Sequence, residues 1–135
     1  MTGFSERRWT TPDGLSLYAR DYPAKGGEQR LPVLCLHGFT RNSADFDDLA
    51  PAIAKAGRRV IVIDVRGRGR SDRDPKPANY HPKIYAKDVI GFLAALGIPR
   101  AVFLGTSMWY RYNNGYIYSV DPTTQLVTAI VRAIV

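Results

Sequence analysis

One serine of the chain lies in a pattern that can make it a nucleophile. The sequence Gly105-Thr106-Ser107-Met108 directly follows the apolar run 102–104. In the pattern G-x-S-x-G, a buried strand turns sharply into a helix and presents the serine hydroxyl at the turn. Ser107 is therefore the candidate nucleophile. The last position of the pattern holds Trp109 instead of glycine, and we expect the large indole to clash with the turn or to force it open.

A serine hydroxyl also needs a base that takes its proton, because a free hydroxyl is a poor nucleophile at neutral pH. The chain has two histidines, His37 and His81, and both precede Ser107. We expect His81 to be a solvated residue at the start of a helix. The one acid after Ser107 is Asp121, and a turn explains it. No complete serine-histidine-acid triad follows from this sequence, so we interpret Ser107 as a structural remnant rather than a working nucleophile.

The elements that must position Ser107 alternate between strands and helices. Short apolar runs too short for helices predict buried strands over 32–36, 59–65 and 101–104. Apolar residues at helical spacing predict helices over 45–56, which Pro51 should start or kink, and over about 82–96. This alternation predicts an α/β fold with a parallel sheet, right-handed crossovers and flanking helices.

An antiparallel hairpin is predicted in front of this sheet. Two β-prone runs, 7–11 and 15–22, flank the turn Pro12-Asp13-Gly14. In open α/β sheets, ligand sites lie beyond the carboxyl ends of the strands. His37, Asp64 and Ser107 each fall at or just after such an end, so we expect a site at this edge of the sheet.

The composition changes after Met108. Residues 109–118 hold five aromatic side chains around an Asn-Asn-Gly turn, and further β-prone residues follow. These signals predict an antiparallel hairpin or meander. The run 125–134 also fits a helical period, so strand and helix both stay open there. The change predicts two units, 1–108 and an unrelated β tail over 109–135.

The charge balance is basic, with 19 Lys and Arg residues against 12 Asp and Glu residues and a net charge of +7. The densest basic cluster consists of Arg66, Arg68, Arg70 and Arg73. Phosphate contacts are one interpretation of such a cluster. Because no aromatic residues lie between the arginines and no nucleic-acid-binding module is present, we expect a solvated loop and no nucleic-acid partner.

No apolar run approaches the roughly 18–20 residues that span a bilayer, so we expect no membrane partner. No apolar segment follows the first basic residues, which predicts a cytoplasmic protein without a secretory signal. The single cysteine, Cys35, lies in an apolar run and is expected to be a buried, inert thiol. We expect no cofactor and no metal.

Residues 8–108 resemble the N-terminal half of an α/β-hydrolase-fold enzyme of the esterase, lactonase and epoxide-hydrolase-like group. The resemblance rests on the segments 36–39, 64–72, 85–89 and 104–108, in this order on the predicted elements. It implies a small ester-like substrate, with Ser107 as nucleophile and the backbone N–H groups of Phe39 and Met108 as the oxyanion hole. It also implies that His37 orients the oxyanion loop and is not the base. The family's base and acid follow the serine and match no position here.

Residues 109–135 resemble the C-terminal module of small bacterial periplasmic proteins of the nickel/cobalt-homeostasis type. The resemblance rests on the aromatic run 110–118 with Val120-Asp121-Pro122-Thr123-Thr124. It implies a hairpin shape. A metal function is not carried over, because this tail has no His or Cys and one Asp.

Two functional classes follow. The first is a bacterial esterase-like hydrolase truncated at the nucleophile elbow and inactive, since its triad is incomplete. The alternative is a non-catalytic fusion or remnant whose tail mediates self-association or partner binding. A partner chain that supplies the missing histidine is a third possibility. An apolar strand edge left bare after residue 104 predicts that the tail, or a second copy in a homodimer, covers it.

Overall fold

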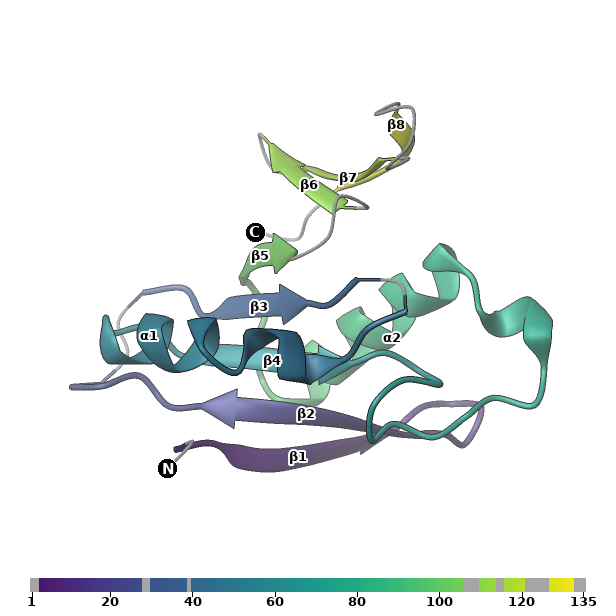
Figure 1. Ribbon diagram of the computed structural model, residues 1–135. Coiled ribbons are helices and arrows are strands. Elements are labelled where there is room, and N and C mark those ends of the chain that lie inside the picture. Colours follow the sequence, from purple (N-terminus) through teal and green to yellow (C-terminus); the bar gives the residue numbers. More distant parts are fainter. Residues whose placement is uncertain are drawn as a thin grey trace.

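The computed structural model describes residues 3–27, 30–38, 40–105, 110–113, 116–120 and 127–132. A five-stranded sheet in the order β1-β2-β4-β3-β5 forms the body of the molecule (Figure 1). Its strands are β1 (Ser5–Thr10), β2 (Ser16–Tyr22), β3 (Val33–Leu36), β4 (Val60–Asp64) and β5 (Val102–Gly105). The flanking elements are α1 (Leu49–Lys55), α2 (Pro82–Ala95) and the short 3-10 helices η1 (Ser43–Phe46) and η2 (Pro77–Asn79).

The predicted α/β fold with an N-terminal hairpin is confirmed. β3 pairs with β4 and with β5 in parallel, as the strand-helix-strand order requires. β1 and β2 are antiparallel, and β2 also pairs with β4 in the antiparallel sense. The sheet is therefore mixed, because the hairpin extends the parallel strands instead of packing over them.

The helix predicted over 45–56 is divided in two. η1 ends at Phe46 and α1 begins at Leu49, so that Pro51 falls in the first turn of α1. Backbone N–H groups in a first turn have no acceptor within the helix, and proline therefore fits there at no cost in hydrogen bonds. The expectation that Pro51 lies at a helix start is confirmed within two residues.

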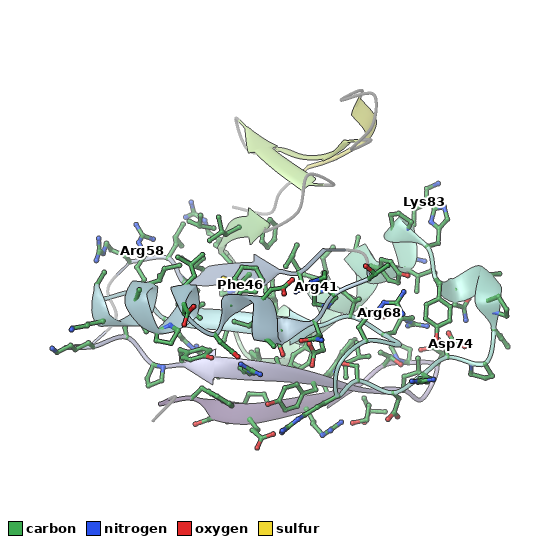
Figure 2. The ribbon with its side chains drawn as sticks, in the orientation of Figure 1. Arg41, Phe46, Arg58, Arg68, Asp74 and Lys83 are labelled. Atoms are coloured by element: carbon green, nitrogen blue, oxygen red, sulfur yellow. The ribbon has the colours of Figure 1, made fainter. Side chains whose placement is uncertain are left out.

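Each face of the sheet carries its own apolar cluster. Side chains alternate between the faces of a strand, so Leu34, Ile61 and Ile63 pack under α2, while Cys35, Val60 and Val62 pack under α1 and η1. Phe46 of η1 is fully buried in the second cluster (Figure 2). Burial raises the pKa of the Cys35 thiol to about 12, which confirms the prediction of an inert core thiol.

The tail forms a separate antiparallel sheet in the order β6-β7-β8 (Figure 1). Its strands are β6 (Tyr110–Asn113), β7 (Tyr116–Val120) and β8 (Val127–Arg132). The predicted meander is confirmed, and the open alternative for 125–134 is decided in favour of a strand over 127–132. This sheet does not extend the first one, so β5 pairs on one side alone among the strands that the structure describes.

No helix in the described part of the chain is long and apolar enough to cross a membrane.

Candidate active site at the carboxyl edge of the sheet

Parallel pairing brings the carboxyl ends of β3, β4 and β5 to one edge of the sheet. Leu36, the last residue of β3, lies opposite Ile63 and Gly105. His37 and Asp64 are therefore neighbours at this edge, and the candidate nucleophile Ser107 follows Gly105 by two residues. Ser107, Met108 and Phe39 lie outside the described residues, so their predicted roles stay predictions.

His37 is buried and both of its ring nitrogens are engaged. The side chain is 3% exposed. The backbone N–H of Val65 donates to Nε2 at 3.1 Å, and Nδ1 lies 2.7 Å from the Gly38 carbonyl oxygen. Because Nε2 accepts, the ring proton is on Nδ1 and is donated to that carbonyl.

The surroundings of His37 keep the imidazole neutral. Burial lowers the pKa of His37 and outweighs the Gly38 carbonyl and the carboxylates of Asp64 and Asp45, which raise it. Figure 2 shows Arg41 and Arg68 close to the points where β3 and β4 finish. A neutral imidazole with no free lone pair has no position left for a further proton. His37 therefore orients backbone and is not placed to act as a base.

Asp64, at the end of β4, is 1% exposed and holds two loops through their backbone. Its Oδ1 accepts from the N–H of Ser43 at 2.6 Å, and its Oδ2 accepts from the N–H of Arg70 at 3.0 Å. The close contact between the Asp64 carboxylate and the main chain before Arg70 requires glycine at position 69. Gly69 has φ +49°, and a Cβ there would lie 2.2 Å from Oδ2.

A second buried cluster centres on Arg66, which is 2% exposed. Its Nε and Nη2 each donate at 2.7 Å to the carboxylate of Asp88 in α2. Its Nη1 also donates to Asp74 at 2.8 Å and to Asp13 at 2.9 Å. The hydrogen bond from Arg66 lowers the pKa of Asp13 to about 2. Arg66 thus ties the hairpin turn, the long loop 65–80 and α2 together.

The expectation of a solvated arginine loop is therefore wrong for Arg66. Sequence reasoning missed Arg66 and Asp88, although one signal was present. Asp88 lies between Tyr85, Val89 and Phe92 in the apolar stripe of α2, and a buried carboxylate needs a cation close by.

The second histidine, His81, caps α2. It is exposed, and its Nδ1 accepts from the N–H of Lys83 at 3.1 Å. The prediction of a solvated residue at a helix start is confirmed. In the described ranges, no group of three or more His, Cys, Asp or Glu residues is arranged to hold a metal ion.

Comparisons with known proteins agree with this architecture. The model of the alpha/beta hydrolase fold family matches residues 32–108. The chain is 43% identical over 75 residues to bifunctional epoxide hydrolase 2 of Mus musculus, covering 55% of this chain and 14% of that protein. It is 32% identical over 126 residues to the non-heme chloroperoxidase of Streptomyces lividans, covering 93% of this chain and 44% of that protein.

The solved structure of an alpha/beta hydrolase from Novosphingobium aromaticivorans matches with a TM-score of 0.73 and 45% identity, covering 79% of this chain and 36% of that one. The chain thus spans less than half the length of these relatives. None of the three is a nickel/cobalt-homeostasis protein, so that resemblance of the tail stays a prediction.

Proposed function

The chain belongs to the α/β-hydrolase fold family, and we propose that it carries the nucleophile and the oxyanion loop of a serine-hydrolase site for small carboxylic esters. Ser107 is the nucleophile of this proposal. The backbone N–H groups of Phe39 and Met108 form its oxyanion hole. Such donors stabilise the negative charge that develops on the carbonyl oxygen in the transition state.

The bonding of His37 supports the assignment of the oxyanion loop. The C=O and N–H of a trans peptide point in opposite directions. His37 Nδ1 holds the Gly38 carbonyl at 2.7 Å, and the N–H of Arg41 donates to the same oxygen at 2.9 Å. Two donors thus fix the carbonyl end of the peptide whose N–H the proposal assigns to the oxyanion hole. A preset amide of this kind is what an oxyanion hole needs.

We further propose that this chain alone does not turn esters over, because no base reaches Ser107. The observation that carries this proposal is the engagement of both ring nitrogens of His37. His81 is committed to the cap of α2 through Nδ1, and the sequence has no third histidine. A histidine from another segment or partner completes the site. Trp109, in place of the elbow glycine, adds to the loss of activity.

Imidazole in solution tests the proposal, because it offers the missing base. We expect p-nitrophenyl acetate hydrolysis by the wild type to match Ser107→Ala in plain buffer and to exceed it when imidazole is added. Imidazole hydrolyses this ester by itself, so the rate with Ser107→Ala is the background to subtract. A rate in plain buffer that depends on Ser107 contradicts the missing base. No difference between the two proteins at any imidazole concentration contradicts the half-site itself.

Self-association is a second candidate function, and it is favoured by the side of β5 that pairs with no other strand in the described part of the chain. The strand Val102-Phe103-Leu104-Gly105 contains no charge and no proline that would block pairing. Beside it lies an apolar groove of about 390 Å³, lined by residues of α2, of β5 and of the loop between them, including Leu93, Ile98 and Phe103. Ile90, on its rim, is 47% exposed. A second copy that adds its own β5 would pair these edges and cover both grooves.

The oligomeric state decides this second candidate. We expect the wild type to elute as a dimer in size-exclusion chromatography with light scattering. Ile90→Lys should elute as a folded monomer, because Ile90 is 47% exposed and a second copy that covers the groove would bury the new charge. A wild-type monomer at all protein concentrations rules the homodimer out. Neither candidate function includes a metal on the ground of the tail's resemblance to nickel/cobalt-homeostasis proteins.

A further inference from the structure

We propose that Asp64 is a positioning residue for the oxyanion loop, fixing the loop's far end while His37 fixes its start. The inference rests on the proposed function, since it concerns the same site. Loop 37–43 leaves β3 and returns at Ser43, the first residue of η1. Two consecutive residues at the end of β4 hold it. Val65 donates to His37 at 3.1 Å, and Asp64 accepts from Ser43 at 2.6 Å.

The loop between these two anchors is also tied internally. The N–H of Arg41 donates to the Gly38 carbonyl at 2.9 Å, and Asn42 Oδ1 accepts from the N–H of Ala44 at 2.9 Å to cap η1. If Ser43 moves, we therefore expect residues 41 and 42 to move with it and to displace the Gly38 carbonyl that Arg41 binds. The bond from Ser43 to Asp64 sets where the whole loop lies relative to the sheet.

Asp64 suits this task because its charged carboxylate faces donors at both oxygens. The N–H of Ser43 reaches Oδ1 and the N–H of Arg70 reaches Oδ2. Its main-chain carbonyl accepts from Ser71 Oγ at 2.6 Å, which fixes the strand end that bears the carboxylate. An asparagine at position 64 has one oxygen and one NH₂ group. The NH₂ would face a second donor, so one of the two loop contacts must be lost.

The expected kinetic effect is specific to the transition state. The carbonyl oxygen of a bound ester carries little charge, and its full negative charge appears in the tetrahedral transition state. A displaced oxyanion loop therefore lowers kcat and leaves KM nearly unchanged. A displacement of about 1 Å in a catalytic group costs on the order of a hundredfold in rate.

The test compares Asp64→Asn with Asp21→Asn in the imidazole-supported reaction, after subtraction of the Ser107→Ala background. Asp21 is a matched control because it is also buried, at 5% exposure, in the same sheet. It pairs with Ile61 near the start of β4, whereas Asp64 ends that strand. We expect Asp64→Asn to lower kcat tenfold or more, on the order given above, at unchanged KM. Asp21→Asn should keep the wild-type rate per folded molecule. Equal rates for these two variants, together with a wild-type kcat in Ser43→Pro, overturn the proposal.

Ser43→Pro provides a second variant if Asp64→Asn does not fold. Proline lacks the N–H that Asp64 accepts, and it is favoured at the first position of a helix. Asn42, with φ −156° and ψ −178°, already has the extended backbone that a following proline requires. The same loss of kcat is expected. A wild-type kcat in Ser43→Pro contradicts the proposed role of Asp64.

Amide hydrogen exchange separates this inference from the proposed function. If the wild type shows no Ser107-dependent rate, the half-site fails, and exchange then decides the role of Asp64 alone. In Asp64→Asn, we expect the amides of Arg41 and Ala44 to exchange at least tenfold faster, while amides of β2 keep their protection. Such a pattern supports the positioning role. Unchanged protection in loop 37–43 overturns it.

Discussion

Two buried carboxylates, Asp64 and Asp21, lie at opposite ends of the same sheet and bind different kinds of donors. Asp64, at the carboxyl end of β4, accepts from the backbone N–H groups of Ser43 and Arg70, which lie on two loops. Asp21, on β2, accepts from arginine side chains, Arg7 at 3.1 Å and Arg59 at 2.9 Å. One carboxylate thus shapes loops, and the other cross-links strands.

This difference distinguishes the end of the sheet that holds the candidate site, near Asp64, from the end that serves as scaffold, near Asp21. Backbone N–H groups are fixed to the main chain, so a carboxylate that binds them sets loop positions within a narrow range. The arginines that pair with Asp21 reach it through long side chains, so these ion pairs set the position of the arginine main chain less tightly. The carboxyl end also holds His37 and the Arg66 cluster, so three polar anchors converge at the end of the sheet where we propose the nucleophile.

The largest effect is expected at Arg66. Arg66→Met leaves the carboxylate of Asp88 buried without its bidentate partner, and such a loss costs about 3 to 5 kcal/mol of unfolding free energy. Arg59→Met is the matched variant at the other end. It should cost less, because Asp21 keeps Arg7 and the Arg59 side chain is partly exposed. Urea unfolding of both variants measures the difference. Equal losses would mean that the two ends are equally dependent on their ion pairs.

Gly69→Ala should have the next largest effect. The new Cβ would lie 2.2 Å from Asp64 Oδ2 at a residue with φ +49°. Backbone strain and displacement of the carboxylate together should cost about 2 to 3 kcal/mol.

Gly26→Ala is the control for Gly69→Ala. Gly26 also has a positive φ, of +80°, but a Cβ there meets nothing within 4 Å. It should cost about 1 kcal/mol from backbone strain alone. Chemical denaturation reports both values. A similar cost at the two positions would show that the Asp64 carboxylate can move away from the new Cβ at little cost in free energy.

Acid should weaken the carboxyl end before the other end. Burial lowers the pKa of His37 below its ordinary value of 6.5. As the pH falls, the imidazole is therefore protonated in the unfolded chain before it is protonated in the folded chain. Stability is therefore lost as the pH falls below about 6.5. For Asp21, burial raises the pKa, but the arginines outweigh it and the net shift is downward from 3.8. Its contribution is lost only below that pH.

Unfolding free energies of the wild type and His37→Gln between pH 7 and pH 5 test this order. The variant lacks the group whose protonation is resisted, so its stability should fall less across this range. Asp21→Asn should keep the wild-type slope there. A wild-type slope in His37→Gln would show that the histidine is already free to protonate in the folded protein.

The sequence predicted the strands, both helices and the convergence of His37 and Asp64 at one edge of the sheet, because these depend on local periodicity and on chain direction. The sequence predicted an interruption of the helix over 45–56 at Pro51 but not its place between Phe46 and Leu49, since apolar spacing continues across Asp47 and Asp48. The bonds of Asp64 and Arg66 escaped it for another reason. Their partners, Ser43 and Asp88, are about twenty residues away, and only the folded sheet brings them together.

The smallest effect is expected for the side chain of Arg70. Its backbone N–H binds Asp64, but its guanidinium forms an exposed ion pair with Glu6 at 2.9 Å and lies over the ring of Tyr18. Arg70→Ala keeps the backbone bond and removes the surface contacts, which contribute less than about 1 kcal/mol. We expect a small loss in urea unfolding and no change in the imidazole-supported kcat. A fall in kcat would mean that the guanidinium, and not the main chain alone, holds the loop on Asp64.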